Sequence, residues 1–411
     1  MKAVVFTLGC KVNECESDSL ISSLIDLGYE VSDKLVFADI YIVNTCAVTK
    51  EAEKKSRQAV SRILKLNPDA KIIMTGCATQ KNPDAFISKK GVQVVTGVFE
   101  KGKILHLIDK SGVLIAPEST VFEELKTVKG LRTRAFIKVQ DGCNNFCSYC
   151  IIPYLRGRCR SRSIDSVKSE IAKLDCAEIV LNGINLSAYD SDGKTLTDLI
   201  CALEDVDARI RLGSLEVGVI DQGFLTALKG LKNFAPHFHL SLQSGSDKVL
   251  KDMNRKYTRS EYAKKVDLIR EYFPNAGITT DIIVGYPTET DEDFSNTVEL
   301  IERVKFSDIH PFIFSAREGT VAYKLKPLSD EIKKARLDKL LELKASCKRN
   351  FILEQTGKIA SVLIEEKKDG YYQGYTENYV RAYIKDDLTS GEIVKVKITG
   401  AVFDGALVEK I

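Results

Sequence analysis

The sequence lacks three features that assign many proteins to a class before any motif is considered: a membrane span, a secretory signal and a large net charge. Its 411 residues contain no run of about twenty apolar residues, the length of a membrane-spanning helix. The first residues, MKAVVFTLGCKVN, hold an apolar run that is too short for a signal peptide and fits a first strand. We therefore predict a cytoplasmic protein of several domains that does not bind a membrane.

The charges nearly cancel over the whole chain but not within one segment. The sequence has 60 Lys and Arg against 57 Asp and Glu, so its total charge does not indicate a nucleic-acid partner. Between Lys126 and Arg162, however, nine basic residues accompany a single acid, Asp141. Such a stretch is either a solvated basic loop or a surface that attracts phosphate or an anionic cofactor.

Cysteine, in contrast, is plentiful. The chain has eleven cysteines, and clustered thiols in the reducing cytosol bind metal or take part in catalysis more often than they form disulfides. Three of them, Cys143, Cys147 and Cys150, fall within the segment CNNFCSYC. We call these three residues the loop triad.

The first segment, residues 1–115, predicts an open parallel α/β sheet. The runs AVVFTLGC, DIYIVNTC and KIIMTGC have the composition of buried strands, and a polar, helix-like stretch follows each one. All three end in a cysteine, and we call Cys10, Cys46 and Cys77 the sheet triad. Because the carboxyl ends of parallel strands form one ligand-binding edge, we expect these thiols to converge. The alternative for each is a buried, inert cysteine.

The second segment, residues 132–346, predicts a complete or partial β/α barrel. Six strand-like runs alternate with amphipathic helical stretches such as SVKSEIAKL and RSEYAKKVDLIREYF. Barrels of this kind have their active site at the carboxyl ends of the strands, and the loop triad follows the first strand. We therefore expect the loop triad to lie at the active face.

The third segment, residues 347–411, predicts a small all-β barrel of the oligonucleotide-binding type. It shows five short strand-like runs, turns at Gly and Asp, and no helical periodicity. Its tyrosines either stack bases or fill the core: Tyr371, Tyr372, Tyr375, Tyr379 and Tyr383. The stretch 112–132 is expected to be a linker.

Three thiols in one loop, with no histidine nearby, favour an iron–sulfur cluster over zinc. A structural zinc site uses four ligands, usually as two separate cysteine pairs. A [4Fe-4S] cluster also takes four ligands, so three cysteines leave one iron open to a small molecule. We therefore interpret the missing fourth ligand as part of the function.

The loop resembles the motif of the radical S-adenosylmethionine superfamily, C-x3-C-x-aromatic-C, at Cys143, Cys147, Tyr149 and Cys150. The resemblance implies a [4Fe-4S] cluster whose open iron binds S-adenosylmethionine. It further implies reductive cleavage of that cofactor to a deoxyadenosyl radical, which abstracts hydrogen from the substrate. Tyr149 would lie against the adenine.

The order of the three segments resembles that of the methylthiotransferase family within this superfamily. The contexts TLGCKVNECES, VNTCAVT and TGCATQ match the family around the sheet triad, which would hold a second [4Fe-4S] cluster. One cluster would generate the radical, and the other would hold the sulfur that is methylated and inserted. By this resemblance the domains are residues 1–115, residues 132–346 and a TRAM-type RNA-binding barrel at 347–411.

Further barrel motifs match the family and imply contacts to cofactor and substrate. The segments EIVLNGINLSAYD, RIRLGSLEV, LSLQSGSDKVLKDMNRKYT and TTDIIVGYPTET supply the residues implied near the cofactor: Asn182, Gly183, Asn185, Ser214, Glu216, Gln243 and Asp281. The loop PYLRGRCRSR supplies Arg156, Arg158 and Arg160, which would contact phosphate, tRNA or the cofactor carboxylate. Thr288 departs from the family, which more often has Gly there.

The first cysteine context is similar to one substrate group of the family. GCKVNECES is similar to the group that modifies N6-threonylcarbamoyladenosine in tRNA, rather than to the group with GCQMN that modifies isopentenyladenosine. The implied product is the 2-methylthio derivative, with tRNA as partner and an electron donor such as flavodoxin or ferredoxin. The alternatives are the isopentenyl substrate, a ribosomal-protein aspartate, and a non-catalytic iron–sulfur protein that binds RNA and senses redox state.

Overall fold

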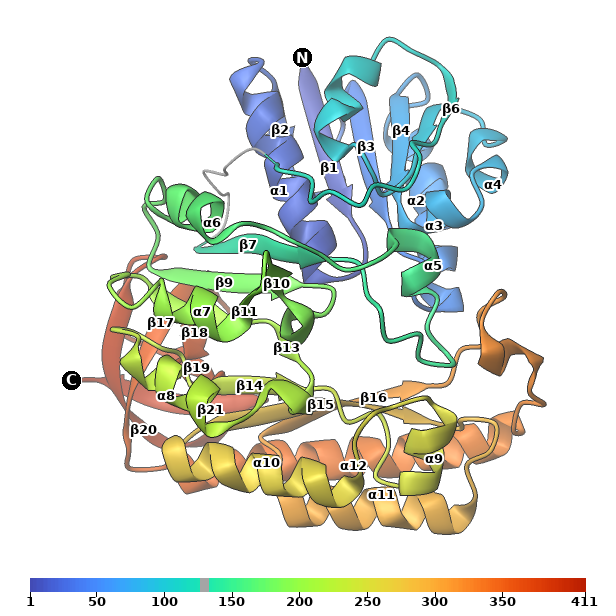
Figure 1. The fold of residues 1–411 in the computed structure, drawn as a ribbon. Helices are drawn as coiled ribbons and strands as arrows, with labels where there is room; N and C mark the ends of the chain where they lie inside the picture. Colours follow the sequence, from blue (N-terminus) through green and yellow to red (C-terminus); the bar gives the residue numbers. More distant parts are fainter. Residues whose placement is uncertain (126–132) are drawn as a thin grey trace.

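The computed structural model describes residues 1–125 and 133–411, in which three units follow one another along the chain (Figure 1). A parallel sheet comes first, a larger set of alternating strands and helices second, and a small barrel last. Helix α1 (Lys11–Asp26) extends from the first unit toward strand β7 (Arg134–Asp141) of the second. In the described ranges, no helix is both long and apolar enough to cross a membrane.

The first unit is a six-stranded sheet in which every pairing is parallel, as predicted. In spatial order its strands are β2 (Glu30–Ser32), β1 (Lys2–Thr7), β3 (Ile40–Thr45), β4 (Lys71–Gly76), β5 (Val92–Thr96) and β6 (Gly112–Leu114). Alternate residues of β3 enter two different apolar clusters, Ile40 and Ile42 on one face and Tyr41 and Val43 on the other. The sheet is therefore covered on both faces, by helices that include α1, α2 (Lys50–Leu66), α3 (Cys77–Lys81) and α4 (Asp84–Ile87).

The central unit contains the six predicted parallel runs, divided between two sheets, with the third run split into two short strands. One sheet holds β7, β9 (Glu178–Gly183) and β12 (Arg209–Leu212) with the antiparallel β8 (Arg160–Ser161). The other holds β13 (Ser214–Leu215), β14 (His237–Leu240), β15 (Gly277–Val284) and β16 (Asp308–Ile313). The break falls at Gly213, where an added Cβ would lie 2.7 Å from Asn182 Oδ1. The strands thus form a partial barrel.

Helices that connect these strands cover the barrel. They are α6 (Ile164–Ile171), α7 (Leu196–Cys201), α8 (Gln222–Gly230), α9 (Asp247–Asp252), α10 (Arg259–Tyr272) and α11 (Asp291–Val304), whereas α5 (Ile152–Arg156) packs with an apolar cluster of the first sheet. Thr258 and Thr290 begin α10 and α11 with reciprocal capping bonds to Glu261 and Asp293, which satisfy the first free backbone N–H groups.

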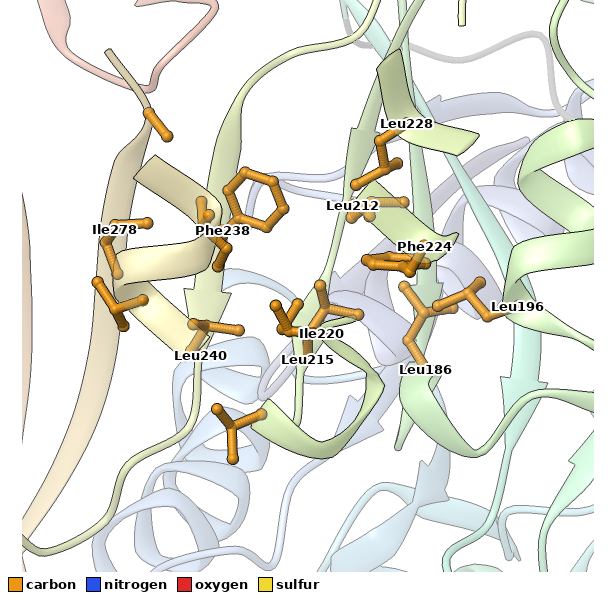
Figure 2. Close-up of a cluster of buried hydrophobic side chains, with 14 of the residues drawn as sticks. Leu186, Leu196, Leu212, Leu215, Ile220, Phe224, Leu228, Phe238, Leu240 and Ile278 are labelled. Atoms are coloured by element: carbon orange, nitrogen blue, oxygen red, sulfur yellow. The ribbon is translucent and has the colours of Figure 1, made fainter. Parts of the chain in front are cut away.

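The apolar core lies between the strands and these helices. Figure 2 shows side chains of α7 and α8, such as Leu196 and Phe224, together with strand residues such as Leu212 and Phe238. All four are at most 2% exposed. Full burial of one such side chain stabilises a fold by about 1.5–3 kcal/mol, so this layer holds the strand ends in fixed positions.

The last unit is a closed five-stranded barrel, as predicted. Its spatial order is β17 (Ile359–Lys368), β18 (Tyr371–Thr376), β19 (Arg381–Ile384), β21 (Gly405–Lys410) and β20 (Ile393–Val402). In β20, Val394, Val396 and Ile398 are buried, while Lys395 and Lys397 between them are exposed. This period of two is the pattern of a strand with one face toward a core.

A long helix crosses the predicted boundary at residue 347. Helix α12 (Asp330–Gln355) continues for eight residues beyond it and packs against β16 and β20. The expectation that no helix follows residue 348 is therefore wrong for residues 348–355. The helix buries few side chains, among them Phe351 and Ile352, so its apolar side is too narrow to give a clear periodicity in the sequence.

Candidate active site

The sheet triad lies at one edge of the first sheet. Each cysteine follows the end of a strand: Cys46 and Cys77 come directly after β3 and β4, and Cys10 comes shortly after β1. These three strands are parallel neighbours. Cys46 and Cys77 are buried, whereas solvent reaches Cys10. Close approach depends on Gly9, since a Cβ there would lie 2.9 Å from Cys46 Cβ and 3.1 Å from its Sγ. The three strand ends thus lie side by side at one edge of the sheet, and the convergence of the three thiols stays a prediction.

The loop triad lies beyond the carboxyl end of β7, as predicted. The Cys143 N–H donates to the Gly157 carbonyl at 3.1 Å, and the Cys150 N–H donates to the Cys147 carbonyl at 2.9 Å. Gly142 has a φ of +72°, and an added Cβ would lie 2.0 Å from the Arg158 carbonyl oxygen. These backbone contacts set the shape of the loop.

Burial raises the pKa of thiols in both triads. It raises the pKa of Cys46 to about 12, with the nearby Cys77 and Cys10 acting in the same direction. It likewise raises the pKa of Cys150 to about 12 and that of Cys143 to about 11. Iron binds the thiolate, so metal binding at either triad releases protons.

Two polar side chains contact the sulfurs of the loop triad. Arg255 donates from Nη1 to Cys147 Sγ at 3.3 Å and pairs with Glu216 at 3.0 Å. Asn185 lies with Nδ2 at 3.9 Å from Cys143 Sγ, while its Oδ1 is buried and has no hydrogen-bond partner among the described residues. A free acceptor beside the cysteines suits the amino group of a bound amino acid such as the methionine part of S-adenosylmethionine.

The thiols of the two triads are the donor type that iron–sulfur clusters take. In the described part of the chain, no group of three or more His, Cys, Asp or Glu side chains is arranged around one ion. A four-iron cluster takes four ligands, one on each iron, and each triad supplies three thiols. Two groups of three thiols therefore suit two clusters, each with one open iron.

The other residues implied near the cofactor divide into two sets. Tyr149 packs against an apolar cluster with Tyr286 and Phe314, and Glu216 accepts from Asn145 at 2.6 Å, so both lie beside the loop triad. Ser214 is exposed at the beginning of β13, directly after Gly213.

Asn182, Gly183 and Gln243 have structural contacts. Asn182 points toward Cys15 of α1, with Nδ2 at 3.8 Å from its Sγ. A Cβ on Gly183 would lie 2.8 Å from Gln140 Oε1, and Gln140 fixes the next loop by accepting the Asn185 N–H at 2.7 Å. Gln243 exchanges backbone hydrogen bonds with β15, next to Asp281.

Asp281 belongs to a group that the motifs did not indicate. It pairs with His239 Nε2 at 3.2 Å, and Thr279 Oγ1 lies 2.9 Å from His239 Nδ1 and 3.0 Å from His237 Nε2. His310 of β16 lies beside His239, with 5.7 Å between ring centroids. Three of the four histidines in the chain thus lie on β14 and β16, the two strands that flank β15.

Arg156 has a role different from the predicted contact with phosphate. Its side chain is fully buried, and its Nη1 donates to Glu16 Oε1 at 2.8 Å and to Asp141 Oδ1 at 3.1 Å. Its Nη2 donates to Asn13 Oδ1 at 2.7 Å, and Asn13 lies one helical turn from Cys10. Arg156 therefore joins the environment of the sheet triad to the strand that precedes the loop triad.

Two lysines complete this buried network. Lys138 lies 3.2 Å from both Glu16 and Asp141, and Lys101 lies 3.5 Å from Glu16. Burial acts to raise the pKa of Glu16, but the charges of Arg156, Lys138 and Lys101 outweigh it and hold that pKa well below its usual range. Glu16 thus favours its charged form, and the members of the network come from both the first and the central unit.

The basic stretch is therefore not a surface patch over its described part. Each of the following basic residues is at most 7% exposed and is paired with an acid: Arg134, Lys138, Arg156, Arg160 and Arg162. All but one of these acids come from outside the stretch. Arg160 also donates to the carbonyl oxygens of residues 156 and 158. Arg158 is exposed, and its guanidinium lies 4.5 Å from the Phe146 ring centroid. Residues 126, 129 and 132 lie outside the described residues.

Some tyrosines of the last barrel form its junction with the central unit. Tyr379 stacks on Tyr375 on one side and on His237 on the other, at 4.6 and 4.5 Å between centroids. The guanidinium of Arg211 lies 4.8 Å from the same ring. These two tyrosines are therefore engaged within the protein, and base stacking remains a prediction for Tyr371, Tyr372 and Tyr383.

Thr288, the departure from the family motif, is held by two contacts. Its hydroxyl donates to Asp252 Oδ2 at 2.5 Å, and its carbonyl accepts from Lys248 at 2.7 Å. The loop turns at Gly285, where φ is +75°, and the Gly285 N–H donates to Glu289 Oε2 at 2.8 Å. Arg255 was missed from the sequence, although the motif MNRKYT contains it.

Comparison with known proteins shows where the chain has relatives. The radical SAM superfamily matches residues 137–301, and the uncharacterized protein family UPF0004 matches residues 2–97. "Threonylcarbamoyladenosine tRNA methylthiotransferase MtaB" of Bacillus subtilis is 37% identical, over 98% of this chain and 94% of its own length. The Thermotoga maritima protein of the same name is 42% identical, over 93% and 91%.

A second group of relatives carries another name. A "tRNA-2-methylthio-N(6)-dimethylallyladenosine synthase" of Thermoanaerobacter is 36% identical, over 98% of this chain and 92% of its own length. Among solved structures, the radical S-adenosylmethionine methyltransferase TsrM of Kitasatospora setae superposes with a TM-score of 0.55 at 15% identity. It covers 76% of this chain and 74% of its own, which is a likeness of fold.

Proposed function

This chain belongs to the methylthiotransferase family of radical S-adenosylmethionine enzymes, and we propose that it converts N6-threonylcarbamoyladenosine, next to the anticodon of tRNA, to its 2-methylthio derivative. The observation that carries this proposal is the placement of two cysteine triads at the strand ends of two joined units. The relatives named for this reaction cover almost the whole chain.

The two triads would hold the two [4Fe-4S] clusters. Cys143, Cys147 and Cys150 would bind the cluster that takes S-adenosylmethionine, and the sheet triad would bind the second. When bound, these groups supply the electron that cleaves the cofactor and a site for the sulfur that is inserted. The reductant is an external donor such as flavodoxin or ferredoxin, and the setting that suits a tRNA substrate is the cytoplasm.

The chain's own residues prepare the loop triad for this chemistry. Arg255 places a positive charge beside Cys147, and its remaining donors bond Glu216 and the Ser241 carbonyl, so the guanidinium stays in place. A hydrogen bond to a ligating sulfur stabilises negative charge and raises the reduction potential of the site. Asn185 offers its free Oδ1 to the amino group of the cofactor.

Apolar packing supports the other side of the loop. Tyr149 lies against the cluster that contains Met253, Tyr286 and Phe314, which keeps water from that face and leaves the ring available to adenine. The hydroxyl groups of Ser148 and Tyr286 bond each other at 2.9 Å and so fix the residue between Cys147 and Tyr149. Glu216, Asn145 and Asp281 are further proposed polar contacts of cofactor or substrate.

Mass spectrometry of tRNA nucleosides tests the function. Cells without the gene should lose 2-methylthio-N6-threonylcarbamoyladenosine and accumulate the unmethylthiolated nucleoside, and the intact gene should restore the product. Restoration by a Cys147→Ala variant would contradict a radical mechanism at the loop triad. Persistence of the product in the deletion strain would contradict the substrate.

The same experiment examines a second candidate substrate. The relatives named for dimethylallyladenosine match over nearly the full chain at 36% identity, only slightly below the first group. If the methylthio derivative of dimethylallyladenosine disappears instead, the chemistry is retained and the substrate belongs to that second group.

A further inference from the structure

A polar pocket separate from both triads lies between the first and the central unit. Its volume is about 260 Å³, and its walls come from helices α2 and α3 and from the segment that follows β16. Its charged lining residues are Lys50, Glu53, Arg57, Lys81, Arg317 and Glu318. The proposed chemistry of the triads uses none of them.

The lining carries an excess of positive charge around a single shared acid. Four cationic and two acidic side chains give the pocket a net charge of +2. Glu53 alone forms ion pairs with Arg57 at 3.0 Å, with Lys81 at 3.7 Å and with Arg317. One carboxylate cannot neutralise three cations, so the pocket attracts a further anion.

Arg317 has a donor that this pairing leaves unused. Its side chain is 2% exposed, and its Nε has no hydrogen-bond partner among the described residues. A buried donor of a charged group costs free energy when it is unpaired, typically about 1–3 kcal/mol or more. An oxyanion in the pocket would satisfy it, and a guanidinium is suited to bonding two oxygens of one phosphate or carboxylate.

The pocket borders the parts of the chain that carry the cysteines. Lys81 ends helix α3, which begins at Cys77, and Lys50 follows Cys46 by four residues. On the opposite wall, the Lys50 N–H donates to Ser315 Oγ at 3.1 Å. The same segment reaches the loop triad, since the Ala322 N–H donates to the Ser148 carbonyl at 2.7 Å.

We propose that this pocket binds an oxyanion of the tRNA substrate, and this inference rests on the proposed function. A tRNA with its modified base near the triads can present two such groups, a backbone phosphate or the carboxylate of the threonylcarbamoyl group. Both are recognised by the same cluster of Lys and Arg. The pocket thereby supplies solvent-accessible cations, Lys50 foremost, that the buried basic stretch does not.

The test is the affinity of the full-length protein for two forms of one tRNA, with and without the threonylcarbamoyl group, over a series of salt concentrations. The variants are Lys81→Gln, Arg57→Gln and Lys50→Gln. Lys50 is exposed, and its replacement disturbs no ion pair among the described residues. Arg62→Gln is the matched control, because Arg62 is an exposed arginine of the same helix that does not line the pocket.

A phosphate contact predicts weaker binding of both tRNAs, by about 3–10-fold, with a salt slope lower by about one. A carboxylate contact predicts the same loss only for the threonylcarbamoyl form. If all three variants bind both tRNAs like Arg62→Gln does, the pocket is not an oxyanion site. Binding can be measured without turnover, so this outcome would not contradict the proposed reaction. If instead the enzyme is inactive but the pocket variants still weaken tRNA binding in a salt-dependent way, only the proposed reaction is contradicted.

Discussion

The two cysteine triads are built in opposite ways. The loop triad comes from eight consecutive residues, and local hydrogen bonds and Gly142 set its shape. The sheet triad comes from three strand ends spread over 68 residues, from Cys10 to Cys77, and exists only when β1, β3 and β4 are paired. A local site can therefore keep its ligands close in a partly folded chain, whereas a distributed site depends on the whole sheet.

The buried ion network connects the surroundings of the two triads. Glu16 belongs to the helix that follows Cys10, and Asp141 lies two residues before Cys143. Arg156 bonds both carboxylates. We therefore expect a cysteine substitution in one triad to leave the other triad intact. Substitutions in the buried network should affect mainly the sheet triad.

Removal of one ligand from the loop triad should have the largest effect. Cys147→Ala should abolish cleavage of S-adenosylmethionine by the reduced protein, because three thiols are the minimum for this cluster. The sheet triad should keep its cluster, since its three strands are untouched. Iron analysis and product chromatography check this; loss of both clusters in equal measure would contradict separate sites.

Removal of Arg156 should destabilise the chain more than any exposed change. Arg156→Met leaves two buried carboxylates without their main partner, and breaking a buried pair in this way costs about 3–5 kcal/mol. The neighbouring exposed Arg158→Met is the matched control. Urea unfolding of the cluster-free protein measures both; equal midpoints for the two variants would show that the network does not hold the units together.

A second ion network, remote from both triads, sharpens the comparison through pH. Burial opposes ionisation of Glu178, yet Arg211, Arg209 and Arg134 lower its pKa from 4.5 to about 2. A carboxyl with a lowered pKa stabilises the fold above its unfolded pKa and loses this contribution as pH falls through the folded value.

The expected contribution of Glu178 is about 3 kcal/mol above pH 4.5, and it should fall away between pH 4.5 and 2. Glu178→Gln should flatten this part of the unfolding free energy against pH. The variant should still assemble both clusters at neutral pH, because Glu178 lies at the beginning of β9, away from the cysteine-bearing strand ends. An unchanged pH profile would contradict the assigned ionisation.

The smallest effect concerns Gly142, which directly precedes the first cysteine of the loop triad. Gly142→Ala and Gly193→Ala place a Cβ at similar φ values of +72° and +79°, so both incur a backbone cost of about 1 kcal/mol. Only at Gly142 would the Cβ also meet backbone, 2.0 Å from the Arg158 carbonyl, whereas Gly193 faces open space. Gly142→Ala should therefore bind less iron at the loop triad. Equal iron content in the two variants would show that this close approach is dispensable.

Local patterns in the sequence predicted most of the fold and the positions of the cysteines at strand ends. Strand runs that end in cysteine indicated the parallel sheet, and the spacing of the loop triad indicated its chemistry, because both depend on neighbours along the chain. The role of Arg156 could not be predicted in the same way, since its partner Glu16 lies 140 residues away. A run of basic residues gives no sign of the acids that the fold brings to it.

Two contacts of the last unit with the rest of the chain show the same limit of prediction from sequence. Its alternating strands were predicted, yet the stacking of Tyr379 on His237 joins residues 142 positions apart and withdraws that ring from RNA. The helical end of α12 was missed because its contacts are with strands of two different units. Period and composition report burial on one element, whereas such junctions arise from tertiary packing.

The central claim is that six cysteines form two separate cluster sites, and the iron content of two triple variants tests it most directly. The reconstituted protein should hold about eight irons per chain. Alanine at Cys143, Cys147 and Cys150 should leave about four irons and no cofactor cleavage, while alanine at Cys10, Cys46 and Cys77 should leave about four irons with cleavage retained. Full loss of iron in either variant, or cleavage that survives without the loop triad, would contradict the account.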